Sequence, residues 1–477
     1  MIAQKIFSHA QQKPEKPALI EDGTVTSYGL FARMINAARA SLSRQNLPKG
    51  QSAIVLGTSF RDQWTIVLAL RAMGIDTVSV GGLKMARDLA LRNVSAVIAP
   101  AQEVQHLDPN LARLVRVIPV PNDVFAPTPS SDIPAPGKGE NGGYLVATSG
   151  TTGRYKKVFF GGAHEEDSVR WTVEAFDFND ETVFHGHNFP LWTGIGGRTI
   201  SAVWYAGGTV IMTRQAGFEG FFEHRPNRAI LTPAMLNDLI AAAGETGRPA
   251  YPAFELDVSG GFLPLSLATR VAKHITPKVN ALYGSTEVTA LMRARFKTAE
   301  DLHWLAEYRS HYEIVDDEGR AVAPGTEGEL RIRLKPFDCH RYLDDEEATA
   351  KFFRDGYFYP GDLATRRDDG RIRILGRAED VINLKGYKVP VAPVEDHIER
   401  TLGADTVCIF SEMDDEGENR VVVAVESNGT FTDEKLRSTI RGRPGFEDAR
   451  FVVLKEFPRA ESGMRKVNRR ELRRLVT

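Results

Sequence analysis

The spacing of hydrophobic and polar residues predicts alternating helices and strands in the first part of the chain. Apolar residues recur at helical spacing over residues 3–12, 27–43 and 64–73. Short apolar runs, typical of strands buried on both faces of a parallel sheet, lie at residues 52–56, 77–80 and 96–98. This alternation predicts a layered α/β architecture.

The same pattern continues to the middle of the chain and then changes. Further strands are expected at residues 144–147, 209–212, 229–231, 256–259 and 279–282. Residues 121–143 are rich in Pro, Ser and Gly and are expected to form a loop. From about Gly328 the pattern indicates short strands with turns, and after Arg377 it predicts a small, separate α+β unit.

Composition excludes several classes of protein. The 477 residues, with 42% hydrophobic and 26% charged, predict a globular chain with at least two folded units. A net charge of −2 argues against a general nucleic-acid-binding surface. The two cysteines, Cys339 and Cys408, lack ligand-like spacing and indicate a reducing, cytoplasmic location. No apolar run approaches the roughly 18 residues of a membrane span, and the polar N-terminus does not resemble a signal peptide.

One loop has the composition of a phosphate-binding site. Residues 148–157 read Thr-Ser-Gly-Thr-Thr-Gly-Arg-Tyr-Lys-Lys. Its glycines allow the backbone N–H groups to approach a ligand, its hydroxyls add donors, and Lys156 adds positive charge. By itself the loop is more typical of a polar surface turn, and it is not a Walker A loop because no Gly-Lys-Ser/Thr follows.

This loop resembles the phosphate loop of the adenylate-forming superfamily, which includes acyl-CoA synthetases, nonribosomal adenylation domains and luciferases. Further segments resemble the family's motifs in the family's order: Ser259-Gly260-Gly261, Tyr283-Gly284-Ser285-Thr286-Glu287, Pro360-Gly361-Asp362, Gly376–Asp380, Leu384–Val389 and Lys466-Val467-Asn468-Arg469. The resemblance spans nearly the whole chain. It implies a large multi-layer AMP-binding domain over residues 1–376, a hinge over 377–380 centred on Glu379, and a small mobile domain over 381–477.

The resemblance implies a reaction in two halves. A carboxylate attacks the α-phosphate of ATP to give an acyl-adenylate and pyrophosphate, and a thiol then takes the acyl group and releases AMP. Thr286 would contact phosphate, Glu287 would hold Mg²⁺, and Lys466 would bridge the carboxylate and the α-phosphate. Without the resemblance, the Thr-Glu pair equally suits a helix start, and Lys466 equally suits a solvated basic surface.

The resemblance also assigns the nucleotide and thiol contacts. Nucleotide-binding residues would be Thr148, Ser149, Gly150, Thr151, Thr152, Gly153, Lys156, Gly260, Gly261, Tyr283, Gly284, Ser285, Asp362 and Arg377. Asp362 would accept the ribose hydroxyls, and Tyr283 would stack on adenine. Lys385, Gly386 and Tyr387 would border the thiol arm.

Three positions depart from the family pattern. Tyr155 stands where the family usually has Pro, and Lys157 stands where it usually has Gly. Gly463 is separated from Lys466 by two residues, whereas it usually precedes the lysine directly. These departures leave open a relative that binds nucleotide without catalysis.

The segment 189–197 resembles the helix start that lines the family's acyl pocket. Phe189 stands where amino-acid-activating relatives have an Asp, so an α-amino acid is not expected. The predicted pocket residues are Phe189, Trp192, Thr193, Gly194 and Phe262. Their rings favour a small or aromatic carboxylic acid, although they equally suit an ordinary core. Arg198 is a possible partner for a second carboxylate on the substrate.

The acceptor thiol is expected to be coenzyme A, with the phosphopantetheine of a carrier protein as the alternative. No carrier domain follows Lys466 in the sequence, which favours a free-standing ligase. The expected cofactors are therefore ATP, Mg²⁺ and coenzyme A, with no nucleic-acid or membrane partner. An alternative of another class is a kinase or NTPase that transfers the γ-phosphate and releases ADP.

Overall fold

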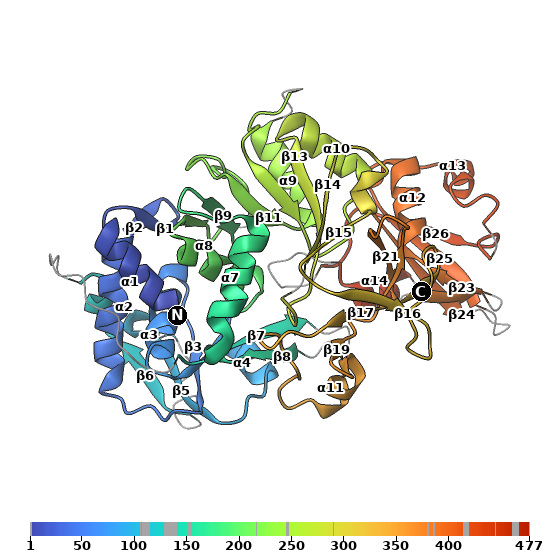
Figure 1. Ribbon diagram of the computed structural model, residues 1–477. Helices are drawn as coiled ribbons and strands as arrows, with labels where there is room; N and C mark the ends of the chain where they lie inside the picture. The colour runs from blue at the N-terminus through green and yellow to red at the C-terminus, as the bar shows by residue number, and fades with distance from the viewer. Residues whose placement is uncertain are drawn as a thin grey trace. The chain divides into compact units, whose positions relative to one another are not determined.

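A computed structural model describes residues 2–104, 106, 115–127, 141–149, 155–215, 217–244, 248–289, 291–378, 381–384, 387–413, 419–443, 445–459 and 467–476. The chain forms two compact units. The first unit comprises Met1–Ile230, Ser285–Thr289 and Leu334–Phe353, and the second comprises Leu231–Gly284, Ala290–Arg333 and Arg354–Thr477. Both units mix helices and strands, which confirms the predicted α/β class (Figure 1).

The first unit contains most of the N-terminal half. Its helices are α1 (Ile2–Gln12), α2 (Tyr28–Ser43), α3 (Phe60–Arg71), α4 (Leu83–Asp88), α5 (Ala101–Val104), α7 (Glu165–Phe176), α8 (Ile200–Ala206) and α11 (Glu346–Phe352), with short turns η1 (Asn122–Phe125), η2 (Gly162–His164) and η3 (Ile195–Thr199). Its strands are β1 (Pro17–Glu21), β2 (Thr24–Ser27), β3 (Ser52–Val55), β4 (Asp76–Ser79), β5 (Val94–Pro100), β6 (Val117–Val120), β7 (Tyr144–Ser149), β8 (Tyr155–Phe160), β9 (Val183–His187), β10 (Thr209–Met212) and β11 (Arg228–Leu231).

These strands form two groups. One sheet has the order β6-β5-β3-β4-β7-β8, in which the pairs are parallel up to β7 and the last pair, β7 with β8, is an antiparallel hairpin. In the second group, β11, β9, β10 and β1 pair in parallel, and β2 returns antiparallel to β1. The parallel pairing agrees with the continuous apolar runs of the predicted strands.

Helix α3 lies at the centre of the first unit's core. Nearly every residue of this helix is buried, and its Trp64 ring meets the ring of Trp204 edge-on at a centroid distance of 5.0 Å. The ring of Phe31 on α2 lies 5.1 Å from Trp204, whose indole N–H donates to the carbonyl of Ala18 at 2.8 Å. The core thus ties α2, α3 and α8 to strand β1 through large aromatic side chains.

The second unit contains the remaining elements. Its helices are α9 (Pro233–Ala243), α10 (Leu265–His274), α12 (Ala392–Leu402), α13 (Asp433–Ser438) and α14 (Arg469–Val476), with the turn η4 (Asp301–His303). Its strands are β12 (Glu255–Val258), β13 (Lys278–Tyr283), β14 (Leu291–Arg295), β15 (Ala306–Tyr308), β16 (Tyr312–Val315), β17 (Glu327–Arg333), β19 (Tyr357–Phe358), β20 (Asp362–Arg366), β21 (Ile372–Arg377), β22 (Val381–Leu384), β23 (Tyr387–Pro390), β24 (Thr406–Met413), β25 (Asn419–Glu426) and β26 (Arg450–Leu454); the two-residue strand β18 (Phe353–Arg354) begins at the last residue of the first unit.

The C-terminal part of the second unit has its own sheet and core. Strands β24, β25 and β26 form a three-stranded sheet, and β22 pairs with β23. One face of the sheet packs against α12 through residues such as Ile398 and Val423, which are completely buried. The other face carries α14 through Leu472, which is also completely buried. The domain boundary at residues 377–380 stays a prediction, and Arg377 is the last residue of β21.

The element predictions hold closely, with two differences. Helix α3 begins at Phe60, four residues before the predicted start, because Ser59 caps it by accepting the backbone N–H of Asp62. Within the predicted loop 121–143, residues Asn122–Phe125 form a short 3-10 turn that buries Val124 and Phe125. Among the described residues, no helix is long and apolar enough to cross a membrane.

Candidate active site

The predicted phosphate loop joins two paired strands in the first unit. Strands β7 and β8 form a hairpin in which Thr148 lies opposite Lys156 and Ser149 lies opposite Tyr155. The tip of the loop, with Gly150, Thr151, Thr152 and Gly153, lies outside the described residues, as does the side chain of Ser149. The hairpin holds both ends of the loop in a fixed register, which suits a loop that must present backbone N–H groups to phosphate.

The two departures from the family pattern in this hairpin have structural roles. The ammonium of Lys157 is buried and forms an ion pair with Asp344, with Nζ 2.8 Å from Oδ2. The side chain of Tyr155 packs on the apolar cluster that includes Val80 and Leu145. Lys157 and Tyr155 therefore contribute to the packing of β8.

The segment 285–289 brings Thr286 and Glu287 into the first unit. The backbone N–H of Cys339 donates to the carbonyl of Glu287 at 2.9 Å, and the hydroxyl of Tyr342 donates to Oε1 of Glu287 at 2.8 Å. The backbone N–H of Thr289 donates to Asp338 at 2.6 Å. The Thr-Glu pair thus lies in a bend that is held at several points, and not at the start of a helix.

Two cations brace the same segment at Thr289. Lys335 donates to the carbonyl of Thr289 at 2.8 Å, and burial lowers the pKa of the Lys335 ammonium. Arg198 donates to the Thr289 hydroxyl at 3.3 Å and to the carbonyl of Ser285 at 3.5 Å. From the sequence, Arg198 is a possible partner for a second carboxylate on the substrate. In the structure its guanidinium instead donates hydrogen bonds to the segment 285–289.

The residues of this segment suit a magnesium ion that is bound partly by substrate and water, and not a metal whose ligands are all protein side chains. Among the described residues there is no cluster of three or more His, Cys, Asp or Glu side chains that could hold a metal by themselves. Mg²⁺ commonly binds through one or two carboxylates, substrate phosphates and water. The buried carboxylate of Glu287, beside the hairpin that carries the phosphate loop, supplies a donor of that kind.

The segment predicted to line the acyl pocket lies beside Thr286. A Cβ atom added at Gly194 would come within 3.7 Å of the Thr286 hydroxyl. The carbonyl of Trp192 accepts the backbone N–H of Ala147 on β7 at 3.3 Å. The structure thus brings the predicted acyl segment, the predicted phosphate-contacting residue and a strand of the phosphate hairpin together in one unit.

The individual side chains of this segment differ in exposure. Phe189 is completely buried, whereas Trp192 is half-buried. The Trp192 ring lies so close to Gly81 that a Cβ atom there would approach it to 2.6 Å. The hydroxyl of Thr193 donates to the carbonyl of Pro190 at 2.7 Å and accepts the backbone N–H of Gly196, so it shapes the turn before α8.

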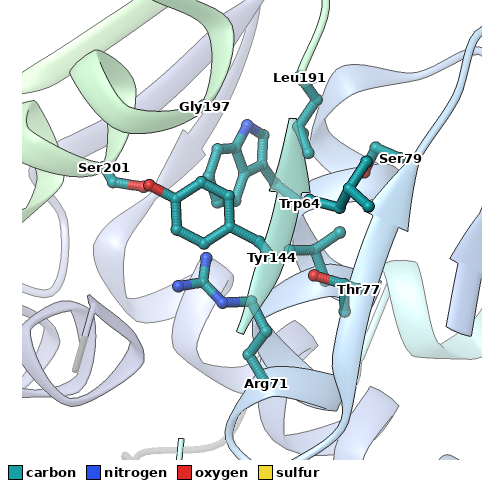
Figure 2. A pocket seen from close by; sticks show the side chains of 10 residues that line it. Trp64, Arg71, Thr77, Ser79, Tyr144, Leu191, Gly197 and Ser201 are labelled. Atoms are coloured by element: carbon teal, nitrogen blue, oxygen red, sulfur yellow. The ribbon is translucent and has the colours of Figure 1, made fainter. Parts of the chain in front are cut away.

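A small cavity lies behind this segment, between α3, β4 and β7 (Figure 2). Its volume of about 10 Å³ is enough for roughly one water molecule, so it is not the pocket for an organic acid. Figure 2 shows the guanidinium of Arg71 beside the ring of Tyr144, 4.7 Å from the ring centroid. Arg71 also forms a buried ion pair with Glu165, and burial lowers the pKa of Arg71 to about 10.

The second unit holds the residues predicted to bind adenine and ribose. The hydroxyl of Tyr283 donates to Oδ2 of Asp362, and Nε of Arg377 lies 3.1 Å from Oδ1 of the same carboxylate. Burial and the neighbouring carboxylate of Asp362 raise the pKa of Tyr283 well above its usual value. The structure therefore brings Tyr283, Asp362 and Arg377 together, with both oxygens of Asp362 engaged, and their contact with a nucleotide stays a prediction.

The glycine turn of this site also has the expected geometry. Gly260 has a φ of 84°, a conformation that favours glycine. Gly261 faces Pro233, to which an added Cβ would approach to 3.5 Å. Gly284 directly precedes the segment that carries Thr286 and Glu287. The turn thus favours glycine at Gly260, whereas its contact with adenine stays a prediction.

Phe262, predicted to line the acyl pocket, belongs to the second unit and stacks on His303. Their ring centroids are 4.2 Å apart at an interplanar angle of 18°. Burial, together with the nearby charges of Arg373 and Arg400, lowers the pKa of His303 to about 4. A single pocket that combines Phe262 with Phe189 and Trp192 stays a prediction, because these residues belong to different units.

The lowered pKa of His303 should make the free energy of unfolding decrease at acidic pH. The pKa of His303 is about 4 in the folded chain, whereas the ordinary histidine value of 6.5 is expected after unfolding. The contribution of the neutral His303 side chain to the free energy of unfolding is therefore present above pH 6.5 and is lost as the pH falls towards 4. His303→Phe, which keeps an aromatic ring, should remove up to about 3 kcal/mol of that acid-induced loss in unfolding free energy. Denaturant unfolding between pH 7 and 4.5 measures it. The exposed His164 supplies the control, His164→Phe, and equal pH profiles for His303→Phe and wild type would contradict the assignment.

The remaining predicted residues lie outside the described parts of the chain or at their edges. Lys385, Gly386, Glu379 and Lys466 are outside the described residues, and the side chain of Tyr387 is too. The residues after Lys466 are well anchored: Asn468 caps α14 by accepting the backbone N–H of Glu471, and Arg469 pairs with Glu395 at 2.8 Å. The roles of Lys466 and of the thiol-arm residues stay predictions.

Several residues of the site were not found from the sequence. Tyr342, Asp338 and Lys335 contact the segment 285–289 from positions 46 to 55 residues away in the chain. No local spacing marks them, because a hydrogen bond between distant residues leaves no periodic pattern. A family alignment of this region is the signal that could have found them.

Comparison with known proteins places the chain in a family. Residues 6–336 match the family model described as AMP-binding enzyme, so the chain belongs to the AMP-binding enzyme family. It is 28% identical to indoleacetate–CoA ligase of Aromatoleum aromaticum over 70% of the chain and 67% of the relative. It is 26% identical to a salicylyl-CoA synthase / salicylate adenylyltransferase of a Streptomyces species over 85% of the chain and 72% of the relative. These relatives confirm the predicted superfamily and enzyme class, an AMP-forming ligase.

Other relatives are longer, and solved structures agree in fold. The chain is 26% identical to phenyloxazoline synthase MbtB of Mycobacterium tuberculosis, but it spans just 29% of that protein's length. The amide bond synthetase McbA of Marinactinospora thermotolerans superposes with a TM-score of 0.82 at 19% identity, with 100% of both chains covered. At that identity the likeness shows the fold, a large N-terminal α/β part with a smaller C-terminal part.

Proposed function

We propose that this chain activates a small or aromatic carboxylic acid with ATP and transfers the acyl group to the thiol of coenzyme A. In the first step a carboxylate oxygen bonds to the α-phosphorus of ATP, and the bond from that phosphorus to pyrophosphate breaks. In the second step the sulfur of the thiol bonds to the acyl carbon, the thiol proton is lost, and AMP leaves.

The observation that carries this proposal is the arrangement of the first unit. Glu287, Thr286, the phosphate hairpin and the predicted acyl segment lie together there. A nucleoside triphosphate and a carboxylate must meet at such a place for an acyl-adenylate to form, since correct placement of the two reactants supplies much of the rate acceleration. The similarity to an indoleacetate–CoA ligase and a salicylyl-CoA synthase supports an aromatic acid.

The chain's own residues would divide the work between them. Thr148, Lys156 and Thr286 bind the phosphates, and Glu287 holds Mg²⁺, which neutralises phosphate charge when bound. Asp362 accepts the ribose hydroxyls, aided by Arg377. Lys466 neutralises charge at the α-phosphate during adenylation. A rotation of residues 381–477 about Glu379 would then bring Gly386 and its neighbours to the thiol.

Two features support the remaining parts of the proposal. Position 189, where amino-acid-activating relatives have an Asp, carries an uncharged Phe, which favours acids without an α-amine. Cys339 and Cys408 are both free and buried, which suits a reducing, cytoplasmic location. A carrier protein's phosphopantetheine remains the alternative acceptor, because it ends in the same arm as coenzyme A.

A panel of acids tests the substrate class. We expect aryl and arylacetic acids to release pyrophosphate in the presence of ATP and Mg²⁺ at least about tenfold faster than their α-amino counterparts. The reason is the cost of placing an unpaired ammonium against an apolar ring. Phenylacetate against phenylglycine is a matched pair. Equal rates for the two would contradict the role of Phe189, and long-chain fatty acids as the best substrates would contradict a compact pocket.

A further inference from the structure

Tyr342 lies on a segment that runs along the edge of the phosphate hairpin. The residue forms an isolated antiparallel bridge with Val158 on β8, and the next residue, Leu343, donates its backbone N–H to the carbonyl of Lys157 at 2.9 Å. The ion pair between Lys157 and Asp344 fastens the same segment once more. Tyr342 itself is 3% exposed. Its position is therefore fixed by the strand that carries Lys156.

The hydroxyl of Tyr342 determines how Glu287 presents its carboxylate. It donates to Oε1 at 2.8 Å, and both side chains are buried. The backbone of Glu287 is held separately by the N–H of Cys339. A buried hydrogen bond of this kind fixes the orientation of a carboxylate without neutralising it.

The ring of Tyr342 contributes to a second contact, with the phosphate-loop lysine. The ammonium nitrogen of Lys156 lies 3.5 Å from the centroid of the Phe352 ring and 5.2 Å from that of the Tyr342 ring. The two rings meet nearly perpendicular, with centroids 6.0 Å apart. We call Tyr342 and Phe352 the aromatic pair. Lys156 makes a further interaction as well, and the aromatic pair contacts its charged end.

We propose that Tyr342 is a positioning residue that links the metal-binding carboxylate to the phosphate-binding lysine. Its hydroxyl orients Glu287 towards the nucleotide's Mg²⁺, and the aromatic pair holds Lys156 in a resting position until a phosphate binds. This inference rests on the proposed function. It assigns to Tyr342 and Phe352 roles that no motif of the sequence indicated.

Loss of the Tyr342 hydroxyl and loss of the Phe352 ring should change the binding free energies, of Mg²⁺ and of the nucleotide respectively, in opposite directions. Removing the hydroxyl frees the Glu287 carboxylate to adopt other orientations, so the cation should bind more weakly. Removing the Phe352 ring destabilises the resting position of Lys156, and a ligand that binds the other position then binds more tightly. The first variant should therefore weaken the binding of Mg²⁺ with the nucleotide, and the second should tighten the binding of the nucleotide itself.

The role of the hydroxyl is tested with the variant Tyr342→Phe. Equilibrium binding of ATP is measured by calorimetry over a range of Mg²⁺ concentrations, in the absence of a carboxylic acid substrate. The Mg²⁺ midpoint should rise about tenfold, while ATP affinity at saturating Mg²⁺ stays close to wild type. The control is Tyr357→Phe, which removes a tyrosine hydroxyl that donates to Glu313 at 3.0 Å elsewhere in the chain. A lower melting temperature with an unchanged Mg²⁺ midpoint would make Tyr342 merely structural and overturn the proposal.

The ring is tested by Phe352→Leu in the same assay. ATP should bind about two- to fivefold more tightly, in line with the loss of one cation–π contact, with the Mg²⁺ midpoint unchanged. Unchanged or weaker ATP binding would overturn the resting role of the aromatic pair. The wild-type measurement distinguishes two failures. If the wild type binds no ATP, the proposed function fails. If the wild type binds ATP normally and neither variant shifts its ATP affinity or Mg²⁺ midpoint, this inference alone is contradicted.

Discussion

Replacing Lys466 with alanine should slow acyl-adenylate formation by about 10²–10³-fold, the usual cost of removing one positioned charge from a transition state. Thiol transfer that starts from supplied acyl-adenylate should stay nearly unchanged, because the family resemblance places Lys466 at the reacting groups during adenylation alone. The substitution should leave the fold intact, since Asn468 and Arg469 anchor the start of α14 independently. Pyrophosphate release and thioester formation are measured separately for wild type and variant.

Gly386→Trp is the complementary change and should give the reverse pattern. A large side chain there should block the path of the pantetheine arm and leave pyrophosphate release intact. Arg465→Ala and Lys455→Ala, which remove other positive charges of the basic C-terminal stretch, are the controls. If Lys466→Ala slows both half-reactions equally, or slows neither while Arg465→Ala or Lys455→Ala abolishes adenylation, the assignment of Lys466 is wrong. The spacing after Gly463 is then the source of the error.

Glu287→Gln should reduce adenylation by orders of magnitude, about 10²–10³-fold, while the chain stays folded. The amide oxygen of Gln can still accept the hydrogen bond from Tyr342, so the substitution removes charge and keeps the local contacts. The loss should be largest at limiting Mg²⁺, because the carboxylate is a hard donor for that cation. The measurement is pyrophosphate release against Mg²⁺ concentration.

A second carboxylate controls for a general effect of losing a charge that accepts a tyrosine hydroxyl. Glu313 also accepts a tyrosine hydroxyl, from Tyr357 at 3.0 Å, and pairs with Arg331 in the second unit. Glu313→Gln should change stability without changing the Mg²⁺ dependence of adenylation. Wild-type rates for Glu287→Gln at limiting Mg²⁺ would show that Glu287 does not hold the metal.

The elements could be predicted where a helix or strand has one clear pattern. The pattern predicts a helix over residues 27–43, and α2 spans Tyr28–Ser43, because its buried and exposed faces alternate at helical spacing. The predicted start of helix α3 is four residues late. Nearly all of its residues are buried, so it has no polar face to mark its length, and its start is set by the cap at Ser59.

The site could be predicted where its residues stand in consecutive motifs. Tyr283, Asp362 and Arg377 come together as the resemblance implies, and Thr286 lies beside Gly194. What the sequence could not indicate is which distant side chains support these residues. The hydrogen bond from Tyr342 to Glu287 joins positions 55 residues apart, and the burial that strengthens it arises when the whole unit folds.

The products formed from ATP distinguish acyl-adenylate formation from transfer of the γ-phosphate. Purified protein would be incubated with ATP, Mg²⁺, coenzyme A and the best acid of the panel, and the nucleotides would be separated by chromatography. An AMP-forming acid–thiol ligase should give AMP and pyrophosphate in equal amounts, formed when the acid is present, together with one acyl-CoA thioester per AMP. Acid-independent formation of ADP and inorganic phosphate would contradict it and would instead indicate transfer of the γ-phosphate.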